Sequence, residues 1–336
     1  MENDKILLAH GGGGRLSYEL ISNLFLPAFK NPILEALDDS ASLAVDKQRL
    51  AFSTDSYTVK PLFFPGGDIG RLAVYGTVND LAMVGALPLY ISISLVIEEG
   101  LALSVLKKII DSIKEAANKT KIKIVTGDTK VVEKGGIDKL FINTTGIGSI
   151  PEGVSISGKN GKVGDMILLS GTVGDHGIAV LSQREGFNFQ GEIKTDCQPL
   201  NNLVKDMLKA SKGIHVLRDP TRGGLATALN EIALSSDVEM IIDEEKIPIK
   251  EEVKGACEML GLDPLSVANE GKLIALVEEK ASEKILKAMK GNPLGQDAVI
   301  IGKVEKGGVS RVILKTLIGG KRILDLPSGE LLPRIC

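Results

Sequence analysis

The sequence predicts an α+β protein, sandwich-like in its layers, with two related domains and a short C-terminal tail. Strand-like and helix-like segments alternate along the chain, which is typical of α/β and α+β architectures. The 336 residues are enough for two domains. A stretch rich in Gly and Ser, residues 150–165, has no long apolar pattern and interrupts the alternation near the middle of the chain. We therefore expect the domain boundary there.

The first half contains the clearest periodic patterns. Residues 90–97 alternate apolar and polar side chains, as expected for a strand with one buried face. Apolar side chains then recur at helical spacing over residues 102–117. The next apolar run, 122–126, predicts a buried strand that ends in the loop 127–130, with the sequence GDTK. These elements predict an N-terminal domain over residues 1–152.

The second half repeats the style of the first, although it shows no clean sequence repeat. Its apolar patterns predict strands at 166–171, 238–242, 273–277 and 312–316, and helices at 200–208 and 224–234. We expect a related C-terminal domain over residues 153–318. From residue 319 onward the periodic pattern fades, and a terminus of this kind is mobile unless something holds it. Residues 319–336 are therefore expected to form a mobile tail.

Composition and charge exclude several classes of protein. The net charge is −3, and no basic patch suggests nucleic-acid binding. No segment reaches the roughly 18 unbroken apolar residues of a membrane span. The N-terminal sequence also lacks the pattern of a signal peptide. With only three cysteines, the chain is expected to keep free thiols in a reducing compartment, the cytoplasm.

Four aspartates occur in similar short settings. Asp39, Asp55, Asp80 and Asp128 each lie at or near the end of an apolar segment, followed mostly by small or hydroxyl residues. A single Asp in such a place is more often a turn or a helix cap. Four of them in ninety residues favour convergence on one point, where carboxylates would hold Mg²⁺ together with nucleotide phosphates.

Two glycine-containing segments are candidates for binding phosphate. The run Gly11–Gly14 precedes Arg15, and free backbone N–H groups of such a run can converge on an anion. The segment 218–224, RDPTRGG, contains Asp219 and Arg222 just before a predicted helix. A flexible loop and an internal ion pair are the respective alternatives. Lys130, two residues after an aspartate, would place an ammonium beside phosphates, or it is an ordinary surface lysine.

The candidate acids, bases and nucleophiles are few. Glu270, in Ala-Asn-Glu-Gly-Lys before a strand, would be a general base if partly desolvated, or else a cap. His176 lies in the loop Gly-Asp-His-Gly and is held in reserve, while His215 has no obvious partner and is interpreted as structural. Cys197 and Cys257 are expected to be buried thiols. Cys336 is interpreted as a reactive, accessible thiol on a moving tail.

These motifs together resemble the HypE family of hydrogenase maturation factors, the carbamoyl dehydratases of the aminoimidazole ribonucleotide synthetase superfamily. The resemblance extends from about residue 6 to residue 336. It rests on the segments LAHGGGGRLSYELI, LDDSA, FSTDSY, PLFFPGGDIGRLAVYGTVNDLAMVGA, IVTGDTKVV, GDHG, LRDPTRGGLATALNE, GACEMLGLDPL, ANEGKL and LPRIC. It implies a homodimer in which the N-terminal halves pair into a β-barrel.

The resemblance also implies a reaction and its residues. A carbamoyltransferase partner, HypF, loads a carbamoyl group onto Cys336. ATP and Mg²⁺ then drive its dehydration to a thiocyanate, and the cyano group passes to iron on a HypC–HypD complex. Asp39, Asp55, Asp80 and Asp128 match the metal aspartates of the superfamily. The nucleotide is expected to contact the last three of these together with Gly11, Gly12, Gly13, Gly14, Asn79, Asp219 and Arg222. The catalytic residues are expected to be Cys336, Lys130 and Glu270, and His176 or a water is the alternative to Glu270 as base.

Two rival functions remain open at the sequence level. Another activity of the superfamily, such as a selenophosphate synthetase or thiamine-monophosphate kinase, would share the aspartates but would not need Cys336. A non-catalytic scaffold would dock its tail on partners and hydrolyse no ATP. If the dehydratase is correct, the tail must reach the aspartates, and its eighteen residues span up to about 60 Å when extended. We expect a docked state and an exposed state of the tail.

Overall fold

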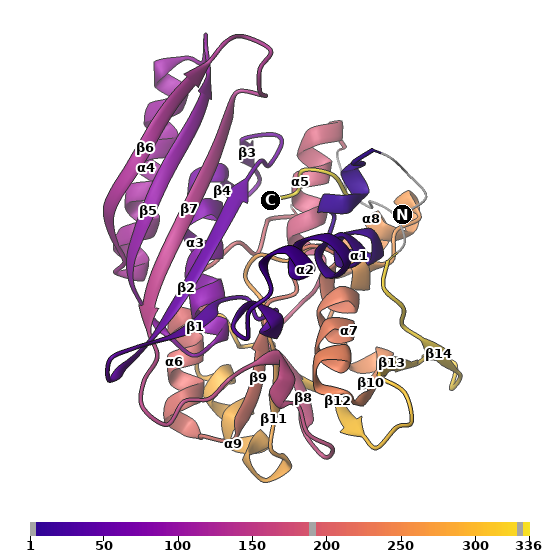
Figure 1. Cartoon of the computed structure of the whole chain (residues 1–336). Coiled ribbons are helices and arrows are strands. Elements are labelled where there is room, and N and C mark those ends of the chain that lie inside the picture. Colours follow the sequence, from indigo (N-terminus) through magenta and orange to yellow (C-terminus); the bar gives the residue numbers. More distant parts are fainter. Residues whose placement is uncertain (1–4, 188–192, 328–331) are drawn as a thin grey trace.

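The computed structural model describes residues 5–187, 193–327 and 332–336. Two sheets, each covered by helices, lie side by side, and the C-terminal end of the chain runs back between them toward the start of α5 (Figure 1). Of the expected tail, residues 328–331 lie outside the described ranges, as do residues 1–4 at the other end. Within the described part, no helix is long and apolar enough to cross a membrane.

The N-terminal half is built on a five-stranded sheet in the order β1-β2-β7-β5-β6. Neighbouring strands are antiparallel except β5 and β6, which are parallel. The strands are β1 (Ala41–Val45), β2 (Gln48–Tyr57), β5 (Leu87–Glu98), β6 (Lys123–Val132) and β7 (Leu140–Ser149). A small hairpin, β3 (Phe63–Phe64) and β4 (Gly67–Asp68), precedes the first long helix.

Two helices cover one face of this sheet. The first, α3 (Ile69–Met83), begins where the Asp68 carboxylate accepts hydrogen bonds from the N–H groups of Gly70 and Arg71. It is buried on nearly all sides, with Arg71 and Asp80 as its less buried positions. The second, α4 (Leu103–Thr120), buries an apolar stripe, as its periodicity predicts. Both helices pack into one core with β2, β5 and β7.

Of the two strands predicted from apolar patterns in this domain, one is confirmed and the other differs from the prediction. The strand expected at 90–97 lies within β5. Residues 123–126 of the predicted strand 122–126 also belong to a strand, but that strand, β6, is exposed, and it continues through residues 127–130, which were expected to form a loop. Because β6 is an edge strand that pairs only with β5, its apolar side chains Ile124, Val125 and Val131 are 45%, 58% and 67% exposed.

The C-terminal half has a seven-stranded mixed sheet in the order β14-β13-β10-β12-β8-β11-β9. Its strands are β8 (Met166–Leu169), β9 (Ile214–Arg218), β10 (Glu239–Asp243), β11 (Ile274–Val277), β12 (Val299–Glu305), β13 (Arg311–Lys315) and β14 (Lys321–Ile323). Its helices are α5 (Asp175–Glu185), α6 (Asn201–Ala210), α7 (Gly224–Ser236), α8 (Glu251–Leu260) and α9 (Glu279–Lys290). The strands and helices predicted for this half are all present.

This second sheet is a central layer between helices. Side chains of α7 pack on one face of it, where Leu225, Leu229 and Ile232 are fully buried. On the other face, α6 and α9 pack through residues such as Leu203 and Ile285. The sheet is therefore covered on both faces, which explains why the strands β8 and β11 are short continuous apolar runs.

The ends of the chain close over the junction of the two halves. The N-terminal segment forms short helices, α1 (Arg15–Leu20) and α2 (Leu26–Phe29), joined by the π-helical turn η2 (Ile21–Phe25). Other short turns are η1 (Leu8–Gly11), η3 (Leu34–Ala36), η4 (Gly158–Asn160), η5 (Glu244–Lys246) and η6 (Pro264–Ser266). The expected tail begins with regular structure, because β14 pairs with β13. No closed barrel forms within the described residues of this single chain.

Candidate active site

A cavity of about 490 Å³ lies between the two halves of the molecule. Segments far apart in the sequence line it, from the glycine run near the N-terminus to the last residue of the chain. Most of the acidic and basic residues singled out in the sequence meet there, namely Asp39, Asp55, Asp80, Asp219, Arg222, Glu270 and Cys336. The structure thus brings a candidate thiol, a candidate base and four carboxylates to one place.

Each carboxylate comes from a different element. Asp39 precedes β1, Asp55 lies on β2, and Asp80 lies near the C-terminal end of α3. Asp219 directly follows β9, and Glu270 precedes β11. The carboxylates therefore converge because the two sheets and α3 meet at the junction, and this convergence depends on both domains.

The four aspartates that line the cavity form a cluster with an excess of negative charge; they are Asp39, Asp55, Asp80 and Asp219. Burial and the neighbouring carboxylates raise the pKa of Asp80 and of Asp219 well above the ordinary value. Burial raises the pKa of Asp39 from 3.8 to about 6, although the Arg218 guanidinium opposes the rise. One oxygen of Asp55, Oδ2, is buried without a hydrogen-bond partner. Such a cluster is suited to a bound cation.

No group of three or more His, Cys, Asp or Glu side chains in the described ranges is already arranged around a metal position. The Ser53 hydroxyl donates a hydrogen bond of 2.6 Å to Asp80 Oδ2, which holds that carboxylate toward β2. The unpartnered Asp55 oxygen and the raised pKa values of its neighbours fit an ion that carries its own water and phosphate ligands, as Mg²⁺ does.

Arg218 belongs to the structural frame of this cluster. Its guanidinium is buried and lies 3.5 Å from Asp39. It also pairs with Glu231 on α7 and donates to the carbonyl oxygen of Leu37 at 3.1 Å. The acidic partners of Arg218 therefore lie outside the segment 218–224, and the ion pair within that segment, considered as the alternative, is not what this arginine forms.

The glycine run packs against the loop that carries Arg222. Arg222 Nη1 donates to the carbonyl oxygen of Gly11 at 3.3 Å. Gly13 has a φ of +80°, and a Cβ there would lie 2.7 Å from Arg222 Cβ, so only glycine fits. Gly12 lines a smaller neighbouring cavity with Arg222, and Gly14 is buried at the start of α1. The two candidate phosphate-binding segments therefore form one contiguous wall.

Glu270 is buried, with 3% of its surface exposed. Burial, followed by Asp219 and Asp196, raises its pKa well above the ordinary value, while Arg222 lowers it. Its backbone N–H donates to Asp196 Oδ1 at 3.0 Å, and its carbonyl oxygen accepts a bond of 3.2 Å from Asn79 Nδ2. Glu270 is therefore fixed by its backbone, and Asn79 acts as a buried support rather than as part of the cavity lining.

The described end of the tail is docked in this site. The backbone N–H of Thr58 donates to the carbonyl oxygen of Cys336 at 2.9 Å. Burial raises the pKa of the Cys336 thiol to about 12, and Arg222 opposes this rise. Cys336 is half-buried in this docked state, so the expectation of an accessible thiol does not hold for it, and the neighbouring Arg334 side chain contacts Asp138 and the carbonyl oxygen of Thr58.

Two predicted site residues lie elsewhere in this chain. Asp128 and Lys130 are on the exposed edge strand β6, where their side chains form an ion pair of 3.3 Å. Their side chains are 59% and 70% exposed. Asp128 lines a separate shallow cavity on that face of the sheet. The apolar run before them predicted a strand end, but the strand continues through both residues.

Other residues have partners that the sequence did not reveal. His176 is buried and contacts the backbone of the tail, so it does not face the carboxylate cluster as a base would. His215, interpreted as a residue without a partner, lies 2.8 Å from Asp165. Asp196, which holds Glu270, lies in no motif. Cys197 and Cys257 are buried, as predicted.

Comparison with known proteins identifies both halves. Residues 37–150 match the AIR synthase related protein N-terminal domain, and residues 162–315 match the corresponding C-terminal domain. The chain is 50% identical to the carbamoyl dehydratase HypE of Cupriavidus necator, over 100% of this chain and 96% of that protein. It is 47% identical to the carbamoyl dehydratase HypE of Escherichia coli, over 99% of this chain and all of that protein.

Solved structures agree with these sequence matches. A HypE–HypF complex matches with a TM-score of 0.88 at 50% identity, over 92% of this chain and 99% of that chain. A HypE structure in complex with ATP matches with a TM-score of 0.84 at 49% identity, over 99% of this chain and all of that chain. A thiamine monophosphate kinase from Aquifex aeolicus, at 22% identity and a TM-score of 0.67, shares the fold. The chain therefore belongs to the HypE carbamoyl dehydratase family of the AIR synthase superfamily.

Proposed function

We propose that this chain uses ATP to dehydrate a carbamoyl group on the sulfur of its own Cys336, turning an S-carboxamide into a thiocyanate. The cyano group is the source of the cyanide ligands on the iron of [NiFe] hydrogenases. One observation carries the proposal: the Cys336 residue lies in the same cavity as the aspartate cluster and Glu270. The names of the relatives and the ATP complex of one of them support it.

The cavity offers what a phosphoryl transfer needs. The glycine run and Arg222 present backbone and guanidinium groups for phosphates. Asp39, Asp55 and Asp80 would hold Mg²⁺, which when bound neutralises phosphate charge during transfer. A bound cation would offset the burial and the mutual repulsion that raise the pKa of Asp80 and Asp39.

The reaction balances as two steps on the carried group. The carboxamide oxygen attacks the γ-phosphorus of ATP, so that an O–P bond forms, the bond to the β-phosphate breaks and ADP leaves. One proton of the amide nitrogen passes to Glu270. The C–O bond then breaks, phosphate leaves with the oxygen and takes up the second N–H proton, and the C≡N bond is complete. A buried carboxylate with a raised pKa suits the role of base.

The docked Cys336 thiol is expected to be unreactive, which fits a carrier that receives its carbamoyl group in another state of the tail. With its pKa near 12, the Cys336 thiol stays protonated at neutral pH in this state. A protonated thiol is a poor nucleophile, so loading by HypF requires an exposed tail. The HypE–HypF complex among the matching structures supports HypF as the carbamoyl donor, and the HypC–HypD complex is proposed as the acceptor. We place these exchanges in the cytoplasm.

The exposed face of β6 supports a homodimer. An edge strand with exposed apolar side chains needs cover, and pairing of two N-terminal sheets into a β-barrel would provide it. In such a dimer, Asp128 and Lys130 on β6 of the partner copy could lie near the nucleotide, which would reunite them with the aspartate cluster. The alternatives are a kinase-like activity that ignores the tail and a scaffold without catalysis.

Mass spectrometry tests the proposal. Protein carbamoylated at Cys336 should lose one water on incubation with Mg–ATP, and the matched sample without ATP should keep its mass. The variant Cys336→Ala should bind ATP and form no product. An unchanged mass in the presence of ATP would contradict the dehydratase. Full ATP-dependent activity on a small substrate after removal of residues 332–336 would favour the kinase-like rival.

A further inference from the structure

A buried hydrogen-bonded chain connects the tail to the segment before α6. His176, on α5, has no exposed surface, and its ring meets the edge of Phe64 at a centroid distance of 5.5 Å. His176 Nε2 lies 2.9 Å from the carbonyl oxygen of Ile335, and its Nδ1 lies 2.7 Å from Thr195 Oγ1. Thr195 Oγ1 also accepts a bond of 3.0 Å from the backbone N–H of Cys197.

The directions of these bonds are all determined. A carbonyl oxygen only accepts, so His176 Nε2 carries the proton that it shares with Ile335. Burial lowers the pKa of His176, so the ring is neutral and Nδ1 is an acceptor. The Thr195 hydroxyl must then donate to Nδ1, because an unprotonated ring nitrogen can only accept, and its oxygen still accepts from the N–H of Cys197. Thr195 thereby fixes the tautomer that holds the tail.

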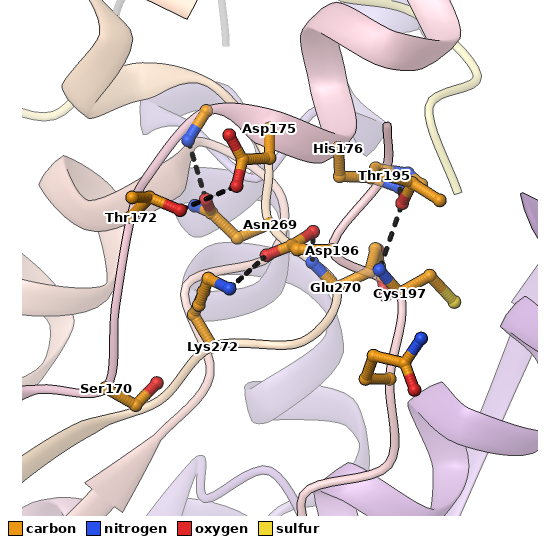
Figure 2. A network of polar contacts seen from close by, with 12 residues as sticks. Ser170, Thr172, Asp175, His176, Thr195, Asp196, Cys197, Asn269, Glu270 and Lys272 are labelled. Atoms are coloured by element: carbon orange, nitrogen blue, oxygen red, sulfur yellow. Dashed lines mark hydrogen bonds and ion pairs between the residues drawn. The ribbon is translucent and has the colours of Figure 1, made fainter. Parts of the chain in front are cut away.

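The residue next to Thr195 holds the proposed base. Asp196 is 7% exposed and accepts the backbone N–H of Glu270 at 3.0 Å. Lys272 Nζ lies 3.9 Å from its other oxygen. Figure 2 shows Asp196 beside the backbone of Glu270, while Thr195 extends the other way to His176. Two consecutive residues therefore make these contacts: Thr195 binds His176, which holds the tail, and Asp196 binds the backbone of the base Glu270.

We propose that Thr195 and Asp196 are positioning residues. Together they fix the position of the carried group on Cys336 relative to the base Glu270. This inference rests on the proposed function and deepens it. Thr195 acts through His176 on the carbonyl just before Cys336, and Asp196 acts on the backbone of Glu270. Neither touches the reacting atoms. Because both lie on one short segment, a shift of that segment moves carrier and base together and preserves their geometry.

The first experiment removes the hydroxyl of Thr195 at nearly constant shape. Thr195→Val should speed iodoacetamide labelling of unloaded Cys336 about tenfold, and it should slow ATP-dependent water loss about tenfold, as expected for one lost buried hydrogen bond. Loading by HypF should remain at least as fast. Thr195→Ser should restore both rates. The control Thr120→Val removes the hydroxyl of a buried threonine that bonds only within α4, and it should change neither rate.

A second variant covers the case in which Thr195→Val does not fold. His176→Leu fills a similar buried volume but has no donor for the carbonyl oxygen of Ile335. It should give the same faster labelling and slower dehydration. Wild-type labelling and dehydration rates in a folded Thr195→Val or His176→Leu protein would overturn the proposal for Thr195.

The third experiment separates the role of Asp196 from a general loss of stability. Asp196→Asn keeps an oxygen for the N–H of Glu270, whereas Asp196→Ala does not. Asp196→Ala should lower kcat at least tenfold with an unchanged KM for ATP, and Asp196→Asn should recover most of that loss. Equal rates in both variants, or a change in KM alone, would overturn the proposal for Asp196. If wild-type protein lost no water, the dehydratase itself would fail, and the labelling experiment would still decide whether Thr195 docks the tail.

Discussion

Removal of one charge from the aspartate cluster should stabilise the empty enzyme. Asp39 is the clearest choice, because its pKa rises from 3.8 to about 6 in the folded protein. That rise means that ionised Asp39 costs the fold about 3 kcal/mol at pH 7. Its side chain is 14% exposed, so solvent screening reduces this cost little. We expect Asp39→Asn to raise the Tm of the nucleotide-free protein by up to about 4 °C, given the unfolding entropy of a chain of 336 residues.

The pH dependence of this gain follows from the same linkage. Between pH 6 and 3.8 the folded protein holds the Asp39 proton and the unfolded chain releases it. The wild type therefore gains stability from this group as the pH falls through that range, which is opposite to the usual behaviour of a carboxylate. The difference in Tm between Asp39→Asn and wild type should be largest at pH 7 and should shrink toward pH 5.

The assay is differential scanning fluorimetry of both proteins with and without Mg–ATP. Mg–ATP should raise the Tm of the wild type more than that of Asp39→Asn, because the variant has lost a proposed metal ligand. Asp111→Asn, on the exposed side of α4, is the matched control and should leave the Tm unchanged. A lower Tm for Asp39→Asn than for this control at pH 7, without nucleotide, would refute the electrostatic reasoning.

Three further predictions use the same geometry. Gly13→Ala should weaken ATP binding at least tenfold, since its Cβ would meet Arg222, whereas Gly11→Ala, with nothing within 4 Å, should bind ATP normally in calorimetry. Asp138→Asn removes the carboxylate that Arg334 contacts at 2.8 Å, so the tail thiol should be labelled severalfold faster; unchanged labelling would show that this ion pair does not hold the tail. Asp80→Asn and Asp128→Asn should each be inactive alone and should partly recover activity when mixed, if the site is completed across a dimer; no recovery in verified mixed dimers would place both residues in one subunit.

The periodic elements could be predicted from the sequence because their signals are local. The alternation at 90–97 and the helical stripe at 102–117 report one buried face each, and both elements are present. The buried strands of the second sheet were also recognisable as short apolar runs. Boundaries were less certain, because the end of a strand depends on its neighbours in the sheet.

The character of β6 could not be predicted in this way. An apolar run such as 122–126 predicts burial, but it does not say whether the cover comes from the same chain. In this chain residues 123–126 are exposed although Ile122 is buried, and Asp128 and Lys130 farther along the same strand lie away from the cluster that they were expected to join. The four-aspartate pattern correctly indicated a shared site for three of its members.

The supports of the site were missed for a different reason. Asp196 reaches Glu270 across 74 residues of sequence, through a backbone N–H that any residue would supply. Thr195 and His176 likewise act on a main-chain carbonyl. Such contacts leave no residue pattern at the receiving position, so a single sequence carries no signal for them. A docked state of the tail was expected from the proposed chemistry, but the groups that hold its main chain could not be predicted, for the same reason.

The way in which the tail is held has a practical consequence. The guanidinium of Arg184 binds the carbonyl oxygens of residues 333 and 334, and the backbone N–H groups of Lys60 and Thr58 bind those of residues 334 and 336. These contacts bind main-chain carbonyl oxygens of the tail and do not depend on its side chains. A short synthetic peptide with the sequence of the tail, but with a last residue that has no thiol, should therefore bind at the position of the docked tail in trans. The peptide would compete with the protein's own tail for this position, and it would be a starting scaffold for cell-permeable probes.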